Sequence, residues 1–135
     1  MGGLTIKAYG FNYSAHYKFD SEPRIHAFAD KLTPKRYWGS LLVEDVAGDN
    51  RKGGLFSLQM YQPKEDGEGQ ITILLQRSAP VKTAIYLSCN DHVNINDDDS
   101  SAEVAMEKIE NTFDASFVNM AKLQNDLIEE TMKDE

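Results

Sequence analysis

Side chains able to act as catalytic acids, bases or nucleophiles are few and scattered in this chain of 135 residues. The histidines, His16, His26 and His92, fall in different predicted elements, and no catalytic motif surrounds any of them. The single cysteine, Cys89, falls on the inward side of a predicted strand, where a thiol packs as a small apolar group. A nucleophilic cysteine needs a neighbouring base, and the sequence nominates none. We therefore predict no catalytic residues.

The run at residues 91–99 is rich in carboxylate and amide oxygens, which suggests a calcium site. Calcium loops need alternating carboxylates, a glycine at the turn and a closing bidentate glutamate. Glu103 could close only a loop that starts at His92, and Asp97 stands where the glycine is needed. The sequence also lacks the motifs of zinc hydrolases, P-loops and dinucleotide-binding folds. We predict neither a metal site nor a cofactor.

Aromatic residues gather in the part of the chain that is predicted to form a sheet. Buried tyrosines need a hydrogen-bond partner, so inward-facing tyrosines can mark a partly polar cavity. One hypothesis is therefore a small-molecule-binding domain with a cavity between the sheet and the C-terminal helix, and the competing interpretation is a filled core. The residues predicted to line such a cavity are Tyr13, Tyr17, Phe56, Met60, Phe113 and Phe117.

Charge is divided unevenly along the chain. Residues 1–90 carry 11 Lys/Arg and 9 Asp/Glu, a net charge of +2, whereas residues 91–135 carry 3 Lys and 13 Asp/Glu, a net charge of −10. Nucleic-acid binding needs clustered basic residues, and the chain has no such block. The acidic segment has two interpretations, which are a solvated helix face and a surface that attracts a basic protein partner.

The elements that must position these residues begin with a strand over residues 4–19. Its alternation of apolar and polar residues breaks near Tyr9 and Gly10, where we predict a β-bulge that keeps Ala8 and Phe11 on the same inward face. A short helix follows, which Ser21 caps and which ends at Thr33.

Further strands are predicted over 36–46, 55–62, 71–76 and 81–90, with a possible short edge strand at 92–96. The short connections between these runs indicate antiparallel hairpins. Because the run at 71–76 is apolar on both faces, we expect it to lie in the middle of the sheet.

The strongest local signal is an amphipathic helix over about residues 101–132, preceded by a predicted capping box from Ser100 to Glu103. At 1.5 Å per residue it would be roughly 48 Å long, whereas a sheet of eight-residue strands has a diagonal of about 35 Å. Three explanations for the excess length are open: a bend near Gln124, cover by a second subunit, or cover by a different protein. The predicted apolar stripe comprises Ala102, Ala105, Met106, Ile109, Phe113, Phe117, Met120, Ala121, Leu123, Leu127 and Ile128.

We thus predict one α+β domain over residues 1–135, with a curved antiparallel sheet of five to six strands in the order β-α-β-β-β-β-α. The long C-terminal helix would pack on one face of the sheet. No apolar run is long enough to span a membrane, and one cysteine suits the cytoplasm.

The leading hypothesis is a non-enzymatic acidic interaction protein that forms a homodimer and binds a basic protein partner, as immunity proteins, inhibitors and anti-defence proteins do. A third interpretation is a structural dimer. The predicted partner-binding residues are Asp97, Asp98, Asp99, Glu103, Glu107, Glu110, Asp114 and Glu130.

Overall fold

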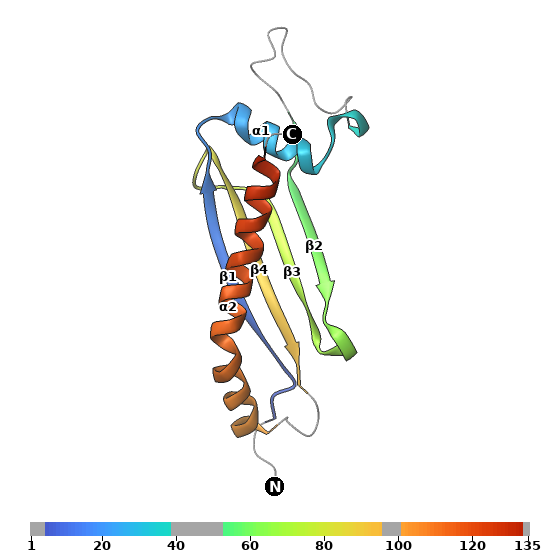
Figure 1. The fold of residues 1–135 in the computed structure, drawn as a ribbon, viewed down its shortest axis with the longest axis vertical. Coiled ribbons are helices and arrows are strands. Elements are labelled where there is room, and N and C mark those ends of the chain that lie inside the picture. Colours follow the sequence, from blue (N-terminus) through green and yellow to red (C-terminus); the bar gives the residue numbers. More distant parts are fainter. Residues whose placement is uncertain (1–4, 39–52, 96–100, 134–135) are drawn as a thin grey trace.

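The computed structural model describes residues 5–38, 53–95 and 101–133. In these residues one long helix crosses one face of an antiparallel sheet, and a short helix lies at the end of the sheet where the long helix finishes (Figure 1). This is the predicted α+β architecture. In chain order the elements are β1 (Ala8–Lys18), α1 (Glu22–Leu32), the 3-10 turn η1 (Lys35–Tyr37), β2 (Ser57–Pro63), the 3-10 turn η2 (Glu65–Gly67), β3 (Gly69–Arg77), β4 (Ala84–Asn94) and α2 (Ala102–Met132).

The sheet of the described residues has four strands in the order β1–β4–β3–β2. The prediction that residues 71–76 are central is confirmed, because β3 pairs with β4 on one side and with β2 on the other. The strand predicted from Arg36 is wrong at its start, where the chain forms η1, and 39–46 lies outside the described residues. The separate edge strand at 92–96 is also wrong, since β4 continues through His92 to Asn94.

The bulge predicted near Tyr9 is absent from β1. Strand β1 pairs with β4 residue by residue, from Ala8 opposite Asn94 to Lys18 opposite Ala84. Tyr9 therefore shares the inward face with Phe11, and its hydroxyl lies 3.1 Å from Thr112 Oγ1 of α2. The alternation breaks at Ala8 instead, which is exposed rather than inward. A contact with a distant helix turn thus decides the register.

The larger core cluster lies where α1, the sheet and the end of α2 meet. It contains the buried side chains of Phe19, Ile25, Phe28, Leu75, Ile85 and Leu87. Helix α1 begins after Ser21, with Pro23 in its first turn, and Thr33 caps its end, as predicted. Its buried face consists of Ile25, Phe28 and Ala29, which is the predicted stripe apart from the partly buried Leu32.

Helix α2 is continuous over 31 residues, about 46 Å, and does not bend at Gln124. The helix begins after Ser101, whose hydroxyl accepts a hydrogen bond from Val104 N, so the capping box predicted from Ser100 is wrong by one residue. The excess length of the helix is smaller than predicted, because the helix is only about 10 Å longer than the strands beneath it. Strands β1 and β4 have 11 residues each, about 36 Å, and α1 contacts the last turns of α2 within the same chain.

The two outer strands of the described sheet, β1 and β2, differ at their free edges. Lys64 N donates to Gly69 O over 2.8 Å, and hydrogen-bonded pairs alternate along antiparallel strands. With Met60 opposite Ile73, the odd-numbered residues of β2 therefore direct their backbone groups away from β3. Pro63 occupies one of these outward positions and has no N–H to donate.

The sheet face opposite α2 is polar. Across β1 and β4, Ser14 Oγ donates to Ser88 Oγ over 3.0 Å, and Tyr86 donates to Ser14 Oγ over 3.1 Å. Hydrogen bonding with these two serines lowers the pKa of Tyr86, with Ser14 the larger cause. Among the described residues no helix is long and apolar enough to cross a membrane.

Candidate functional site

Four of the predicted partner-binding residues form one row on α2. Glu103, Glu107, Glu110 and Asp114 are exposed and recur at spacings of four, three and four, so they lie within about 60° of one another around the helix. We call them the acidic row. No other described residue forms an ion pair with any of the four. Glu103 lies in the first turn, where a carboxylate stabilises the helix. Like charges at this spacing repel one another, so the stability of the helix does not explain the other three.

The other predicted partner-binding residues do not join the acidic row. Glu130 lies about 180° around the helix from Glu103 at 100° per residue, and its carboxylate pairs with Lys133 Nζ at 2.7 Å. Residues 97–99 lie outside the described residues. The structure therefore brings together only the acids of the first half of α2.

A row of exposed apolar side chains runs beside the acidic row. Met106, Phe113 and Phe117 are each about half exposed, at 48%, 50% and 46%. The ring of Phe113 meets Phe11 edge-on at a centroid distance of 5.3 Å, and Phe117 meets Tyr13 edge-on at 5.0 Å. We call these three α2 residues the outer flank. The two phenylalanine rings contact β1, the outer strand on this side of the sheet.

Polar residues are buried among apolar ones, such as Ala105 and Met120, where α2 faces the sheet. Gln124 is fully buried: its amide nitrogen donates to Tyr13 O over 3.0 Å, and its Oε1 accepts from the Tyr17 hydroxyl over 3.1 Å. Ser116 and Thr131 are buried as well. These residues define the inner flank. The predicted stripe is confirmed for Ala105 and Met120, which are buried, and is wrong for Met106, Phe113 and Phe117, which are about half exposed.

A buried carboxylate sits beneath the inner flank. Asp91 of β4 is 5% exposed; its Oδ1 lies 2.5 Å from Lys64 Nζ, and its Oδ2 accepts a 2.6 Å hydrogen bond from Ser116 Oγ. The Lys64 ammonium compensates much of the cost of burying this charge. Sequence analysis missed this cluster, although Asp91 shares its strand face with Ile85, Leu87 and Cys89 and so pointed to a buried charge.

An open pocket of about 400 Å³ adjoins this cluster, lined by residues of β1, β3, β4 and α2 together with Lys64 and Glu68. Its chemistry does not support a nucleophilic site. The Ser116 hydroxyl donates to a carboxylate that Lys64 already neutralises, and an activated serine needs a free base at this position.

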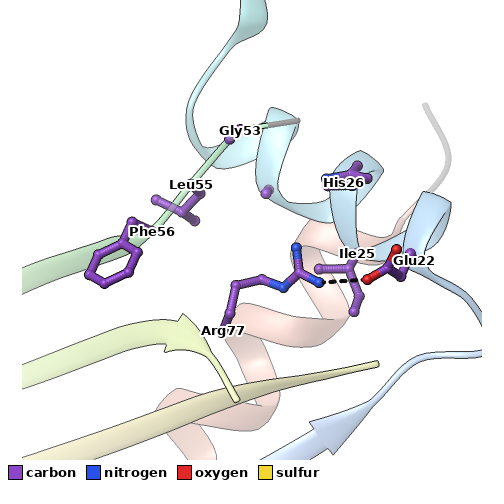
Figure 2. Close-up of a pocket in the computed structure, with 9 residues that line it drawn as sticks. Glu22, Ile25, His26, Gly53, Leu55, Phe56 and Arg77 are labelled. Atoms are coloured by element: carbon purple, nitrogen blue, oxygen red, sulfur yellow. Dashed lines mark hydrogen bonds and ion pairs between the residues drawn. The ribbon is translucent and has the colours of Figure 1, made fainter. Parts of the chain in front are cut away.

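A second pocket, of about 250 Å³, lies between α1 and the residues before β2 (Figure 2). Arg77 reaches across from the end of β3 and pairs with Glu22 of α1 at 3.2 Å. Phe56 stands at the rim and is 85% exposed. The guanidinium is neutralised by its partner, so this ion pair joins α1 to the sheet rather than forming a charged ligand site.

Of the six residues predicted to line an aromatic cavity, the structure brings together Tyr13, Phe113 and Phe117, but not the other three. Tyr13 and Met60 lie in one row across the sheet but on opposite outer strands, with Cys89 and Ile73 between them. Tyr17 lines a pocket beside α1, and Phe56 lines the pocket of Figure 2. Phe113 and Phe117 belong to the outer flank.

The structure also describes the surroundings of Cys89 and His16, two of the residues considered for catalysis. Cys89 is fully buried and faces inward, as predicted. Burial raises the pKa of its thiol and the hydrogen bond from Gln124 lowers it, with burial the larger cause. His16 is on the exposed sheet face, 2.9 Å from Ser78 Oγ through Nδ1. Within the described residues, no group of three or more His, Cys, Asp or Glu side chains is placed to hold a metal ion.

The candidate site is therefore the surface of α2 that carries the acidic row and the outer flank. Comparisons of the chain with protein-family models, with curated proteins and with solved structures gave no match.

Proposed function

We propose that this protein is a non-enzymatic interaction protein of the inhibitor type, which binds a basic protein partner through the acidic row and the outer flank of α2. The single observation that carries the proposal is the position of these two rows side by side on one exposed surface. Immunity and anti-defence proteins that neutralise basic effectors would use a surface of this kind.

The acidic row supplies attraction over a distance. Its four carboxylates extend over about 16 Å of helix, and no described cation is paired with them. Such a concentration of one charge accelerates encounter with an oppositely charged surface and selects against acidic partners. It also makes binding weaken with salt, since the Debye length is about 8 Å at physiological ionic strength.

The outer flank supplies short-range contact. Phe113 and Phe117 are already held at one edge by Phe11 and Tyr13, so little side-chain freedom remains to be lost on binding. Aromatic side chains at the centre of an interface, surrounded by polar groups, contribute most of the binding free energy in many complexes.

A basic partner fits this surface better than a second copy of the chain. A two-fold dimer uses the same patch on both subunits, so it would place one acidic row near the other. The homodimer hypothesis also depended on excess length of α2, which the 11-residue strands reduce to about 10 Å and which α1 partly covers. The second copy is therefore the competing occupant.

Binding of a basic probe tests the proposal. A peptide of about twelve residues that alternates lysine and valine is titrated against the protein at low and at physiological ionic strength. The triple variant Glu107→Lys, Glu110→Lys and Asp114→Lys should weaken binding at least about tenfold, through loss of attraction and added repulsion.

A matched variant separates the surface from the net charge. Asp20→Lys, Glu129→Lys and Glu130→Lys changes the net charge by the same amount at exposed residues outside the acidic row, and should weaken binding much less. Equal effects of the two triple variants would contradict the proposed function.

A further inference from the structure

The backbone of β1 exposes a complete row of hydrogen-bonding groups. Phe19 N donates to Thr83 O, and Ile95 N donates to Lys7 O. Because bonded pairs alternate in an antiparallel ladder, the odd-numbered residues of β1 bond to β4. The N–H and C=O groups of the even-numbered residues, among them Asn12, Ser14 and His16, point away from the sheet. No described strand pairs with this edge.

This edge lacks the features that normally block strand addition. Outer strands are usually short, bulged, charged or interrupted by proline. Strand β1 has 11 residues in unbroken register with β4. From Ala8 to His16 its outward positions carry neither proline nor an acidic or lysine side chain, whereas β2 has seven residues and ends at Pro63.

Helix α2 overlies the region beside this edge. The amino-terminal half of α2 lies on the outer side of β1 in Figure 1, and this half carries Met106, Phe113 and Phe117. A strand added to β1 would lie about 4.8 Å beyond it. Side chains on one face of that strand would meet the exposed sides of Phe113 and Phe117. The outer flank is therefore placed so that it could pack on one face of an added strand.

We propose that β1 accepts an extended basic segment of the partner as an additional strand, with lysine or arginine at alternate positions facing α2. This inference rests on the proposed function and specifies how the partner binds. The aliphatic stems would cross Phe113 and Phe117, and the charged ends would reach Glu110 and Asp114. The spacing fits, since side chains at this helical separation lie about 6 Å apart and alternate strand residues about 6.7 Å apart.

Charge selects this occupant over the β1 strand of a second copy. A second copy would bring its own acidic row to the same place, whereas alternate lysines neutralise Glu110 and Asp114. The lysine–valine peptide described above has the required alternation. A peptide of the same composition, with its lysines in one block, keeps the charge and loses the alternation, so it should bind about tenfold more weakly.

Two variants at one residue test strand addition. Ser14→Pro removes an outward N–H and leaves the bonds to β4 intact, whereas Ser14→Ala loses the same hydroxyl contacts with Ser88 and Tyr86 and keeps the N–H. We expect Ser14→Pro to weaken peptide binding at least about tenfold, and Ser14→Ala less than about twofold. Bound peptide should also slow hydrogen exchange at the amides of Asn12, Ser14 and His16.

Backbone methylation of the peptide gives a test that does not depend on how Ser14→Pro folds. In an added strand, every second amide of the peptide faces β1. Methyl groups on these amides should abolish binding to the wild-type protein, and methyl groups on the remaining amides should not. Equal effects of the two sets would overturn strand addition. If the acidic-row variant still weakened binding in that case, the proposed function would stand without strand addition. A wild-type dimer that Ser14→Pro dissociates and Ser14→Ala leaves intact would instead identify a second copy as the occupant.

Discussion

Two residues of the inner flank, Gln124 and Thr131, lie on nearly the same side of α2 as Phe117, one and two heptads further along the helix. The inner flank faces the sheet with Ser116, Gln124 and Thr131 buried, while the outer flank leaves Phe113 and Phe117 half exposed. Specific hydrogen bonds to Asp91, Tyr13 and Tyr17 make this possible, because each buried polar group then has a partner. The comparison teaches that hydrogen bonds, together with buried apolar residues such as Ala105 and Met120, hold this helix on the sheet, while Phe113 and Phe117 stay half exposed.

Removal of Asp91 should have the largest effect on this comparison. Asp91→Ala leaves Lys64 without its anion and Ser116 without its acceptor, and should lower the free energy of unfolding by about 3 kcal/mol, at the low end for a buried pair because Lys64 is partly exposed. Urea denaturation measures the loss. Asp91→Asn, which keeps the shape and an acceptor for Ser116, should cost less. A loss below about 1 kcal/mol for Asp91→Ala would mean that the inner flank does not hold the helix.

Gln124→Ala should come next, with a loss of about 2 kcal/mol, because it leaves the Tyr17 hydroxyl without its better-placed acceptor and opens space in the core. The neighbouring Asn125→Ala is a matched control, since Asn125 is exposed and makes only a 3.5 Å contact with Tyr17. Thermal unfolding of both variants should separate them clearly. Similar values for the two would argue against Gln124 as an anchor.

The outer flank should contribute less to stability. Phe113→Ala and Phe117→Ala should each cost about 1 kcal/mol, because each ring is already half exposed. Phe28→Ala, at a ring that is 1% exposed, should cost about 4 kcal/mol. If either outer-flank variant lost as much as Phe28→Ala, these rings would be part of the core, and the contrast between the flanks would disappear.

The smallest effect should be a loss of stability at high pH. Burial raises the pKa of the Cys89 thiol and, with the neighbouring Tyr13 and Cys89, that of the Tyr17 hydroxyl. Above about pH 9 the unfolded chain therefore releases these protons before the folded chain does, and stability falls as pH rises through the folded pKa values. Cys89→Ala should flatten this decline in chemical denaturation at pH 8 and pH 10. An unchanged slope would exclude Cys89 as its source.

Local signals in the sequence predicted the helices and the interior strand. Pro23 and Thr33 delimit α1, and apolar residues on both faces place β3 inside the sheet. These predictions succeed because they depend on neighbours a few residues apart. The acidic row followed equally from the helical period.

Which residues of α2 the sheet covers could not be predicted from neighbours a few residues apart. Gln124 bonds to Tyr13 and Tyr17, more than a hundred residues earlier, and Ser116 bonds to Asp91 on another element. A helical wheel places Phe113, Phe117 and Gln124 on nearly the same side, and only the crossing of α2 over β1 decides which of them the sheet covers (Figure 1). The same long-range dependence explains the misplaced bulge, which the contact between Tyr9 and Thr112 removes.

Pro63 has a consequence for how copies of this molecule could join into fibres. Growth of a continuous sheet needs two receptive sides on every unit, one to receive a neighbour and one to offer to the next. Here β2 presents a short row that lacks a donor at Pro63, while β1 presents a long and regular one. We therefore expect assembly to stop once β1 is occupied, because the shorter edge of β2 offers fewer donors to a next copy.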